Sequence, residues 1–143
     1  RSIMKITLCG SIKFIDEMKE AKLKLEKIGH EVILPYSVEI NQGKQFWEDL
    51  KGKNIEEFVS LKKERMRGHF DKVKKADAIL VLNYDKDGKK NYIGPNTFLE
   101  MAIAFDHGKK IFILNPVSEN DPRHEELITM SPICIDTDFE KIE

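Results

Sequence analysis

The sequence predicts an α/β domain in which helices cover both faces of a mainly parallel, five-stranded sheet. Short apolar runs alternate along the chain with segments whose apolar residues recur every three or four positions, as strands alternating with amphipathic helices do. The apolar runs are continuous, which is typical of strands buried on both faces. These observations indicate a single-domain, doubly wound fold of the Rossmann-like or flavodoxin-like type.

The first half of the chain contains two of the predicted strands. The run "KITLCG" (5–10) predicts a buried strand, and the amphipathic helix that follows it ends at Gly29. The run "HEVILP" (30–35) predicts the second strand. Residues 36–53 match neither pattern, and a longer helical pattern extends over 55–73.

The second half of the chain contains the other three predicted strands. They are the runs "ADAILVLN" (76–83), "KKIFILNP" (109–116) and "ICIDTD" (133–138). A helix is expected over 96–107. The segment "DPRHEELITM" (121–130) predicts a short helix with an acidic cap and its proline at the first helical position.

Length and charge limit the classes of protein to which the chain can belong. A chain of 143 residues predicts one domain; we expect it to span 4–143, with the tripeptide before Met4 as an expression remnant. Its 24 basic and 25 acidic residues show no bias toward a nucleic acid polymer or an anionic membrane as partner. No apolar run approaches the ~20 residues of a membrane span.

Cysteine and histidine usage favours a cytoplasmic protein without a metal. Cys9 and Cys134 both lie in apolar runs, and buried free thiols are typical of a reducing compartment. The two cysteines and four histidines show no paired metal-ligand spacing. We therefore expect neither a metal nor another cofactor.

The loop after the first predicted strand is a candidate ligand site, because ligands of doubly wound sheets bind at the carboxyl ends of the strands. In "CGSIKF", Gly10 permits close approach of a ligand to the backbone. Ser11 either caps the following helix or binds a phosphate or sugar hydroxyl there. Lys13 could add a positive charge. The alternative is a plain strand–helix turn with a serine cap.

The loop after the third predicted strand leads into the stretch "YIGPNTFLE" (92–100). Asn83 ends the strand, and Gly94, Asn96 and Thr97 precede Glu100. If Thr97 caps the helix, Glu100 completes a capping box. The other interpretation is that Glu100 lies at the ligand edge of the sheet and acts on a sugar, with Asn96 and Thr97 holding the helix start or the substrate.

Two features of the helix over 55–73 have structural and functional interpretations. His69 lies eight residues before Asp77, either at the pocket edge or on the surface, where a histidine is more commonly found. The basic run "LKKERMR" (61–67) is interpreted as a solvated helix face.

The segments "KITLCGSIKF", "ADAILVLN" and "GPNTFLEMAIAFDHGKKIFIL" together resemble the nucleoside 2-deoxyribosyltransferase family, and within it the small (deoxy)nucleoside 5′-phosphate N-hydrolases. The resemblance covers most of 4–116. It implies cleavage of an N-glycosidic bond, with hydrolysis favoured over base transfer. It implies that Glu100 is the nucleophile, that Ser11 binds a 5′-phosphate, and that Lys13 corresponds to a basic residue of the same loop.

Among the positions at which the chain departs from this family, two bear most directly on the expected site. His69 stands where an aspartate is usual, and Gly94 stands where relatives carry an acid or a serine. These departures motivate an alternative, a nucleotide-binding or sensing module without turnover. A second alternative is a phosphoribohydrolase of the cytokinin-activating type, whose "G-G-x-G-T-x-x-E" motif matches the spacing of Thr97 and Glu100.

The resemblance also implies a homodimer or higher homo-oligomer, because family members complete each pocket with residues of a neighbouring subunit. The segment "ENDPRHEELITMSP" (119–132) is the expected contribution, with His124, Glu125 and Glu126 as candidates. The expected substrate is a nucleoside or nucleotide.

Overall fold

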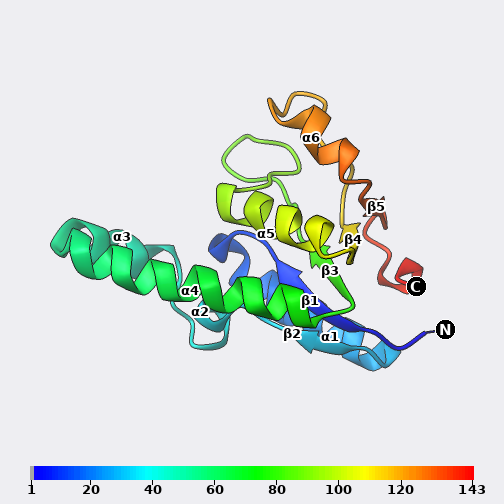
Figure 1. Ribbon diagram of the computed structural model, residues 1–143, viewed down its shortest axis with the longest axis horizontal. Helices are drawn as coiled ribbons and strands as arrows, with labels where there is room; N and C mark the ends of the chain where they lie inside the picture. The colour runs from blue at the N-terminus through cyan, green and yellow to red at the C-terminus, as the bar shows by residue number, and fades with distance from the viewer. Residues whose placement is uncertain (1) are drawn as a thin grey trace.

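The protein forms a five-stranded sheet in which every strand pair is parallel, as seen in a computed structural model that describes residues 2–143 (Figure 1). The strand order is β2-β1-β3-β4-β5, which is the flavodoxin-like order. The predicted fold class is therefore confirmed. The strands are β1 (Lys5–Cys9), β2 (Glu31–Ile33), β3 (Ala78–Val81), β4 (Lys110–Ile113) and β5 (Ile133–Cys134).

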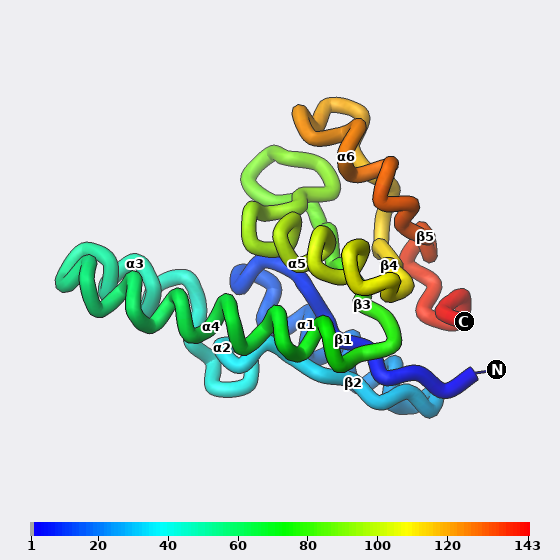
Figure 2. Tube along the Cα trace, viewed as in Figure 1, coloured from blue at the N-terminus to red at the C-terminus, as the bar shows by residue number. Residues whose placement is uncertain are grey.

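Helices connect the strands, and part of this helical layer projects beyond the sheet. The helices are α1 (Ile15–Ile28), α2 (Tyr36–Glu39), α3 (Lys44–Lys53), α4 (Ile55–Lys75), α5 (Pro95–Asp106) and α6 (His124–Thr129). The segment 36–53, which matched no sequence pattern, forms α2 and α3. Figure 2 shows α3 and the first half of α4 extending away from the sheet as a helical arm. None of the helices in residues 2–143 has the length and apolar character that a bilayer crossing requires.

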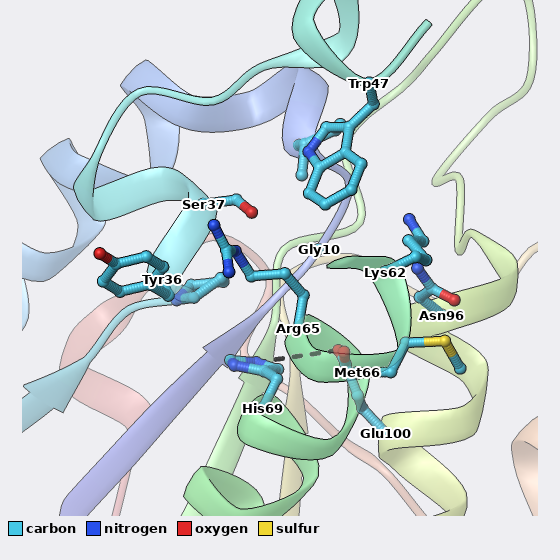
Figure 3. Close-up of a pocket in the computed structure, with 12 residues that line it drawn as sticks. Gly10, Tyr36, Ser37, Trp47, Lys62, Arg65, Met66, His69, Asn96 and Glu100 are labelled. Carbon is cyan, nitrogen blue, oxygen red and sulfur yellow. Dashed lines mark ion pairs between the residues drawn. The ribbon is translucent and has the colours of Figure 1, made fainter. Parts of the chain in front are cut away.

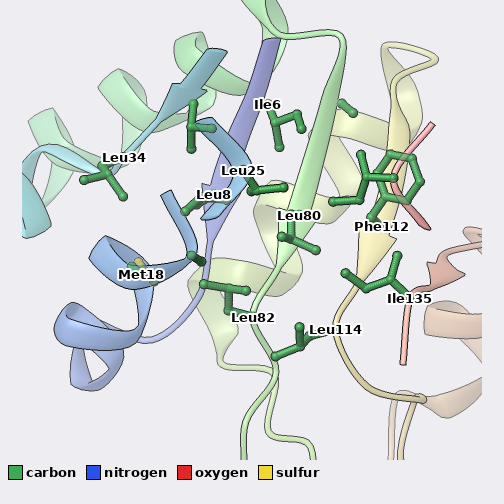
Figure 4. Close-up of a cluster of buried hydrophobic side chains, with 14 of the residues drawn as sticks. Ile6, Leu8, Met18, Leu25, Leu34, Leu80, Leu82, Phe112, Leu114 and Ile135 are labelled. Atoms are coloured by element: carbon green, nitrogen blue, oxygen red, sulfur yellow. The ribbon is translucent and has the colours of Figure 1, made fainter. Parts of the chain in front are cut away.

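Both faces of the sheet are buried, which explains why the strands are continuous apolar runs. On β1, Ile6 and Leu8 point to the face covered by α1, where they join Met18 and Leu25 in one core cluster (Figure 4). Cys9 belongs to the opposite cluster, together with residues of α4 and α5. Successive side chains of a strand point to opposite faces, so a strand between two helical layers needs apolar residues at every position.

The start of α5 differs from the expected cap. Gly94 is the N-cap and Pro95 is the first helical residue, where the missing N–H of proline leaves no donor unpaired. Neither Asn96 nor Thr97 caps the helix. Glu100 thus lies in the second turn, beyond the third helical position that a capping box requires, so the capping interpretation of Glu100 is wrong.

The start of α6 also differs from expectation. The helix begins at His124, and Pro122 lies in the turn before it rather than at the first helical position. Asp121 holds this turn by accepting hydrogen bonds from the backbone N–H and the guanidinium of Arg123, at 2.8 and 3.0 Å. The helix therefore begins at His124 rather than at Pro122, and Asp121 stabilises the turn before the helix instead of capping it.

The strand order creates a crevice between β1 and β3. The chain leaves β1 toward β2 on one side, whereas β3 lies on the other side of β1 and continues to β4. Connections that diverge in this way leave a gap at the carboxyl ends of the two strands, which is the usual ligand position in such sheets. Cys9 is the last residue of β1, and Gly10 follows it at this edge.

Candidate active site

A pocket lies at the carboxyl end of β1, between the loops after β1 and β2 and the helices α3, α4 and α5 (Figure 3). The two loops supply backbone and apolar side chains, and the helices, including the short α2, supply two aromatic rings, two cations, a histidine and a carboxyl group. The lining residues are Gly10, Ile12, Pro35, Tyr36, Ser37, Trp47, Lys62, Arg65, Met66, His69, Asn96 and Glu100.

Glu100 places a buried carboxyl group in this pocket. Its side chain extends from α5 toward α4, and the residue is only 8% exposed. Burial raises the pKa of this carboxyl from 4.5 to about 8, while a hydrogen bond from the Cys9 thiol and the charge of Lys62 oppose that rise. A carboxyl group that titrates near neutral pH inside a pocket is a frequent property of catalytic acids and bases.

His69 lies beside Glu100 and is buried, so the expectation of a surface position is wrong. It sits on α4, which packs against α5, and its Nε2 is 3.9 Å from Oε1 of Glu100. The same Nε2 is 3.0 Å from the backbone oxygen of Leu8. A carbonyl oxygen can only accept a hydrogen bond, so Nε2 carries the ring proton and donates it to Leu8.

The imidazole of His69 is neutral at physiological pH. Burial, together with the charge of Lys72, lowers its pKa from 6.5 to about 4, although the hydrogen bond to Leu8 opposes both effects. Cys9 lies next to the ring, with Sγ 3.7 Å from Nε2. Burial also raises the pKa of the Cys9 thiol, and the neighbouring Glu100 raises it further. Cys9 is therefore a protonated thiol that donates to the Glu100 carboxyl.

Two cationic side chains of α4 form the outer wall of the pocket together with aromatic rings. Lys62 Nζ lies 5.2 Å from the centre of the Trp47 ring, and the Arg65 guanidinium lies 4.6 Å from that of Tyr36. Arg65 also donates a hydrogen bond to the Gln42 side chain. The basic run 61–67 is thus only in part a solvated helix face, because α4 passes directly over the ligand edge of the sheet.

A second group of charges surrounds Ser11, next to the pocket residues Gly10 and Ile12. Ser11 caps a short 3₁₀ turn by accepting from the backbone N–H of Lys13 at 3.2 Å. It also accepts from Lys86 Nζ at 3.3 Å. Lys13 is paired with Asp87 at 2.6 Å, and Lys44 acts electrostatically on Lys86 and Asp87. Three lysines against one aspartate leave this region positively charged.

Of the other residues predicted to bind substrate, one lines the pocket and the rest lie outside it. Asn96 lines the pocket beside Glu100. Asn83 is fully buried and exchanges hydrogen bonds with Asn115, which ties the end of β3 to the end of β4. Thr97 is buried within α5, and neither it nor Gly94 is among the lining residues.

Several lining residues carried no usable signal in the sequence. Trp47 lies in the segment that matched no pattern, and Tyr36 and Ser37 begin the same segment. Their one common feature is position, since all three follow the carboxyl end of β2. The rule that ligands bind beyond the carboxyl ends of strands could have drawn attention to them.

Comparison with known proteins agrees with the fold. No family model and no curated protein sequence matches the chain. Among solved structures, the chain is similar to a CMP N-glycosidase, BcmB, from Clostridium botulinum. The two share 20% sequence identity over 92% of this chain and 89% of that one, with a TM-score of 0.51. This similarity shows the fold.

Proposed function

We propose that the protein cleaves the N-glycosidic bond of a nucleoside 5′-monophosphate, with Glu100 as the nucleophile. The observation that carries the proposal is a single buried carboxyl group that lines the pocket at the ligand edge of the sheet. The sequence resemblance to nucleoside 2-deoxyribosyltransferases and the fold shared with a CMP N-glycosidase support the same chemistry.

The proposed reaction has two steps. In the first, a Glu100 oxygen forms a bond to the anomeric carbon C1′ while the bond from C1′ to the base nitrogen breaks, and the base leaves with that electron pair and gains a proton. In the second, water attacks C1′ as the bond from C1′ to Glu100 breaks, and the water gives up a proton that replaces the one taken up by the base. The transition states resemble an oxocarbenium ion, which a carboxylate stabilises on one face of the sugar. Covalent catalysis divides one difficult step into two easier ones.

The outer wall of the pocket suits a nucleobase. Trp47 and Tyr36 offer apolar ring surface, and the cations of Lys62 and Arg65 lie over those rings. Hydrogen-bonding groups of Ser37 and Asn96 also line the pocket. Aromatic faces bind planar bases by stacking, and polar groups at the edges can select among them.

The charges around Ser11 suit the 5′-phosphate. A phosphate there would meet the Ser11 hydroxyl and the ammonium group of Lys86, which already contact each other. Lys13 could join them by exchanging its ion pair with Asp87 for the phosphate. Charge-assisted hydrogen bonds to phosphate are among the stronger polar contacts in proteins, so this region would favour nucleotides over nucleosides.

The proposal is tested by measuring release of free base from a panel of nucleoside 5′-monophosphates and nucleosides, with ribose or 2′-deoxyribose. Base release by the wild type that is lost in Glu100→Gln supports the enzyme. Glu56→Gln is the matched control, because Glu56 is an exposed acid of α4 remote from the pocket. Tight nucleotide binding without base release would instead support a sensing module. Incorporation of an added acceptor base would indicate transfer rather than hydrolysis.

We also propose that the working form is a homodimer or a higher homo-oligomer. Glu125 and Glu126 are exposed on α6, while the His124 ring contacts the backbone oxygen of Ser118 within its own chain. The two acids are thus the better placed of the three candidates to reach a neighbouring pocket. Light scattering that finds only monomers at assay concentration would remove this part of the proposal.

A further inference from the structure

Three potential metal ligands meet at the inner wall of the pocket, two of them among its lining residues. Cys9 ends β1, His69 lies on α4 and Glu100 lies on α5, and all three side chains are buried. One ligand atom from each residue lies within 4.8 Å of the other two. Cys9 Sγ is 3.7 Å from His69 Nε2, which is 3.9 Å from Glu100 Oε1. A thiolate, an imidazole nitrogen and a carboxylate oxygen are the ligand types that zinc uses in proteins.

The spacing of these atoms is close to that of a tetrahedral zinc site. Zinc bonds of about 2.3 Å to sulfur and about 2.1 Å to nitrogen or oxygen place neighbouring ligand atoms roughly 3.4 to 3.6 Å apart. The two measured separations exceed this spacing by only a few tenths of an ångström. The third separation, between Cys9 Sγ and the Glu100 carboxyl, is within 4.8 Å. Coordination also requires the His69 ring to turn away from the Leu8 oxygen that Nε2 faces.

The pocket supplies both the entry path and the fourth coordination position. His69 and Glu100 line the pocket, whereas Cys9 lies behind them. An ion entering from the pocket therefore meets the imidazole and the carboxylate first and the thiolate last. Its fourth position faces the pocket and can hold a water molecule, as in sites with three protein ligands.

We propose that Cys9 Sγ, His69 Nε2 and Glu100 Oε1 form a reversible binding site for Zn²⁺. Binding replaces the thiol proton of Cys9, which passes to solvent. It also breaks the hydrogen bond from His69 to Leu8, because Nε2 must present its lone pair, and the ring proton then resides on Nδ1. No other group of three such ligands occurs within residues 2–143.

The support around His69 makes this a reversible site rather than a permanently occupied one. Histidine ligands usually donate a hydrogen bond through their second nitrogen, and losing that support typically costs roughly 10- to 100-fold in metal affinity. Nδ1 of His69 is buried without a hydrogen-bond partner in the part of the chain that the structure describes. The site therefore has the ligands for zinc but lacks the outer hydrogen bond that would hold the ion tightly.

Zinc binding and glycosidic cleavage would exclude each other. The ion would use the carboxylate that attacks the sugar in the proposed function, and it would occupy the space behind the anomeric carbon. Zinc would thus act as an inhibitor that competes with the nucleotide. This consequence rests on the proposed function, whereas the binding of the ion does not.

The test uses Co²⁺ as a spectroscopic probe on protein first treated with a chelator. One equivalent of Co²⁺ should give a thiolate-to-metal charge-transfer band and the intense visible bands of a four-coordinate ion, and Zn²⁺ should abolish both. Cys9→Ser should lose the charge-transfer band, and Glu100→Gln should weaken binding by at least about tenfold. Cys134→Ser is the matched control and should keep the full spectrum, because Cys134 lies on β5, away from the pocket.

Several outcomes would overturn the metal site. They are absence of the bands in the wild type, their retention in Cys9→Ser, or their loss in Cys134→Ser. Circular dichroism must show that the variants are folded, and Glu100→Gln provides an independent result if Cys9→Ser does not fold. Failure of the wild type to release base, with the cobalt spectrum intact, would contradict the proposed function and leave the metal site standing.

Discussion

The Nε2 atom of His69 lies 3.9 Å from Oε1 of Glu100, yet the two side chains form no ion pair at neutral pH. Burial lowers the pKa of the imidazole to about 4 and raises that of the carboxyl to about 8. Between these values both groups are predominantly uncharged. The nucleophile of the proposed reaction must be ionised, so the protonation of Glu100 controls the activity of the free enzyme.

The first prediction concerns the pH dependence of base release. Below pH 8, kcat/KM for the best nucleotide should rise about tenfold per pH unit and then level off, because only the ionised carboxyl attacks the sugar. The profile should level off near pH 8 because the pKa of Glu100 is about 8. Initial rates at low substrate concentration, measured from about pH 5.5 to about pH 9, give this profile. A flat profile would mean that Glu100 does not control the rate.

The second prediction concerns Lys62, whose positive charge lowers the pKa of Glu100. Replacing it in Lys62→Met should move the acidic limb of the kcat/KM profile to higher pH and reduce activity at pH 7 several-fold. Lys63→Met is the matched control, since Lys63 is the exposed neighbour on α4 and does not line the pocket. A uniform loss of rate at every pH would assign Lys62 to substrate binding instead.

The third prediction concerns stability. Burial raises the pKa of Glu100 from 4.5 to about 8, so between these pH values the folded protein holds a proton that the unfolded chain has released. The free energy of unfolding therefore falls as pH rises, by up to about 1.4 kcal/mol per pH unit for this group. Glu100→Gln removes this contribution, and the variant should become more stable than the wild type as pH rises from 4.5 to 8.

Urea unfolding of both proteins across that pH window measures the difference. The other titrating groups are common to the two proteins, so the comparison isolates the carboxyl of residue 100. Parallel stability curves for wild type and Glu100→Gln would show that this carboxyl is not desolvated in the folded state.

The fourth prediction concerns the 5′-phosphate. Ser11→Ala and Lys86→Met each remove one of two contacting groups, and a hydrogen bond to a charged group contributes about 1.5–3 kcal/mol. Each variant should raise KM for a nucleoside 5′-monophosphate by roughly ten- to 100-fold. The rate with the matching nucleoside, which lacks the phosphate, should change little. Lys90→Met is the control for a general loss of positive charge, and equal effects on nucleotide and nucleoside would exclude a phosphate site.

Much of the fold could be predicted because each strand is buried on both faces and therefore reads as a continuous apolar run. Periodicity likewise located α1, α4 and α5. The position of Glu100 could be predicted from the rule that ligands lie at the carboxyl ends of parallel strands, and the structure places its side chain in the pocket. Its role as nucleophile stays a prediction.

The rest of the site could not be predicted, because it depends on packing between distant segments. Cys9 and His69 are 60 residues apart, so no local spacing shows that they touch. Histidines are more commonly found on the surface, whereas the packing of α4 on α5 buries His69. Lys62 belongs to a basic run that resembles a solvated face, and its place over Trp47 depends on the path of α3.

The most direct test of the central claim is to trap the sugar on the protein. A nucleotide carrying fluorine at C2′ destabilises the oxocarbenium-like transition states and slows release of the covalent intermediate. Mass spectrometry of the digested protein should then find the added sugar phosphate on the peptide that contains Glu100, and no adduct in Glu100→Gln. An adduct on another residue, or base release by Glu100→Gln at the wild-type rate, would contradict the proposal that Glu100 attacks the sugar.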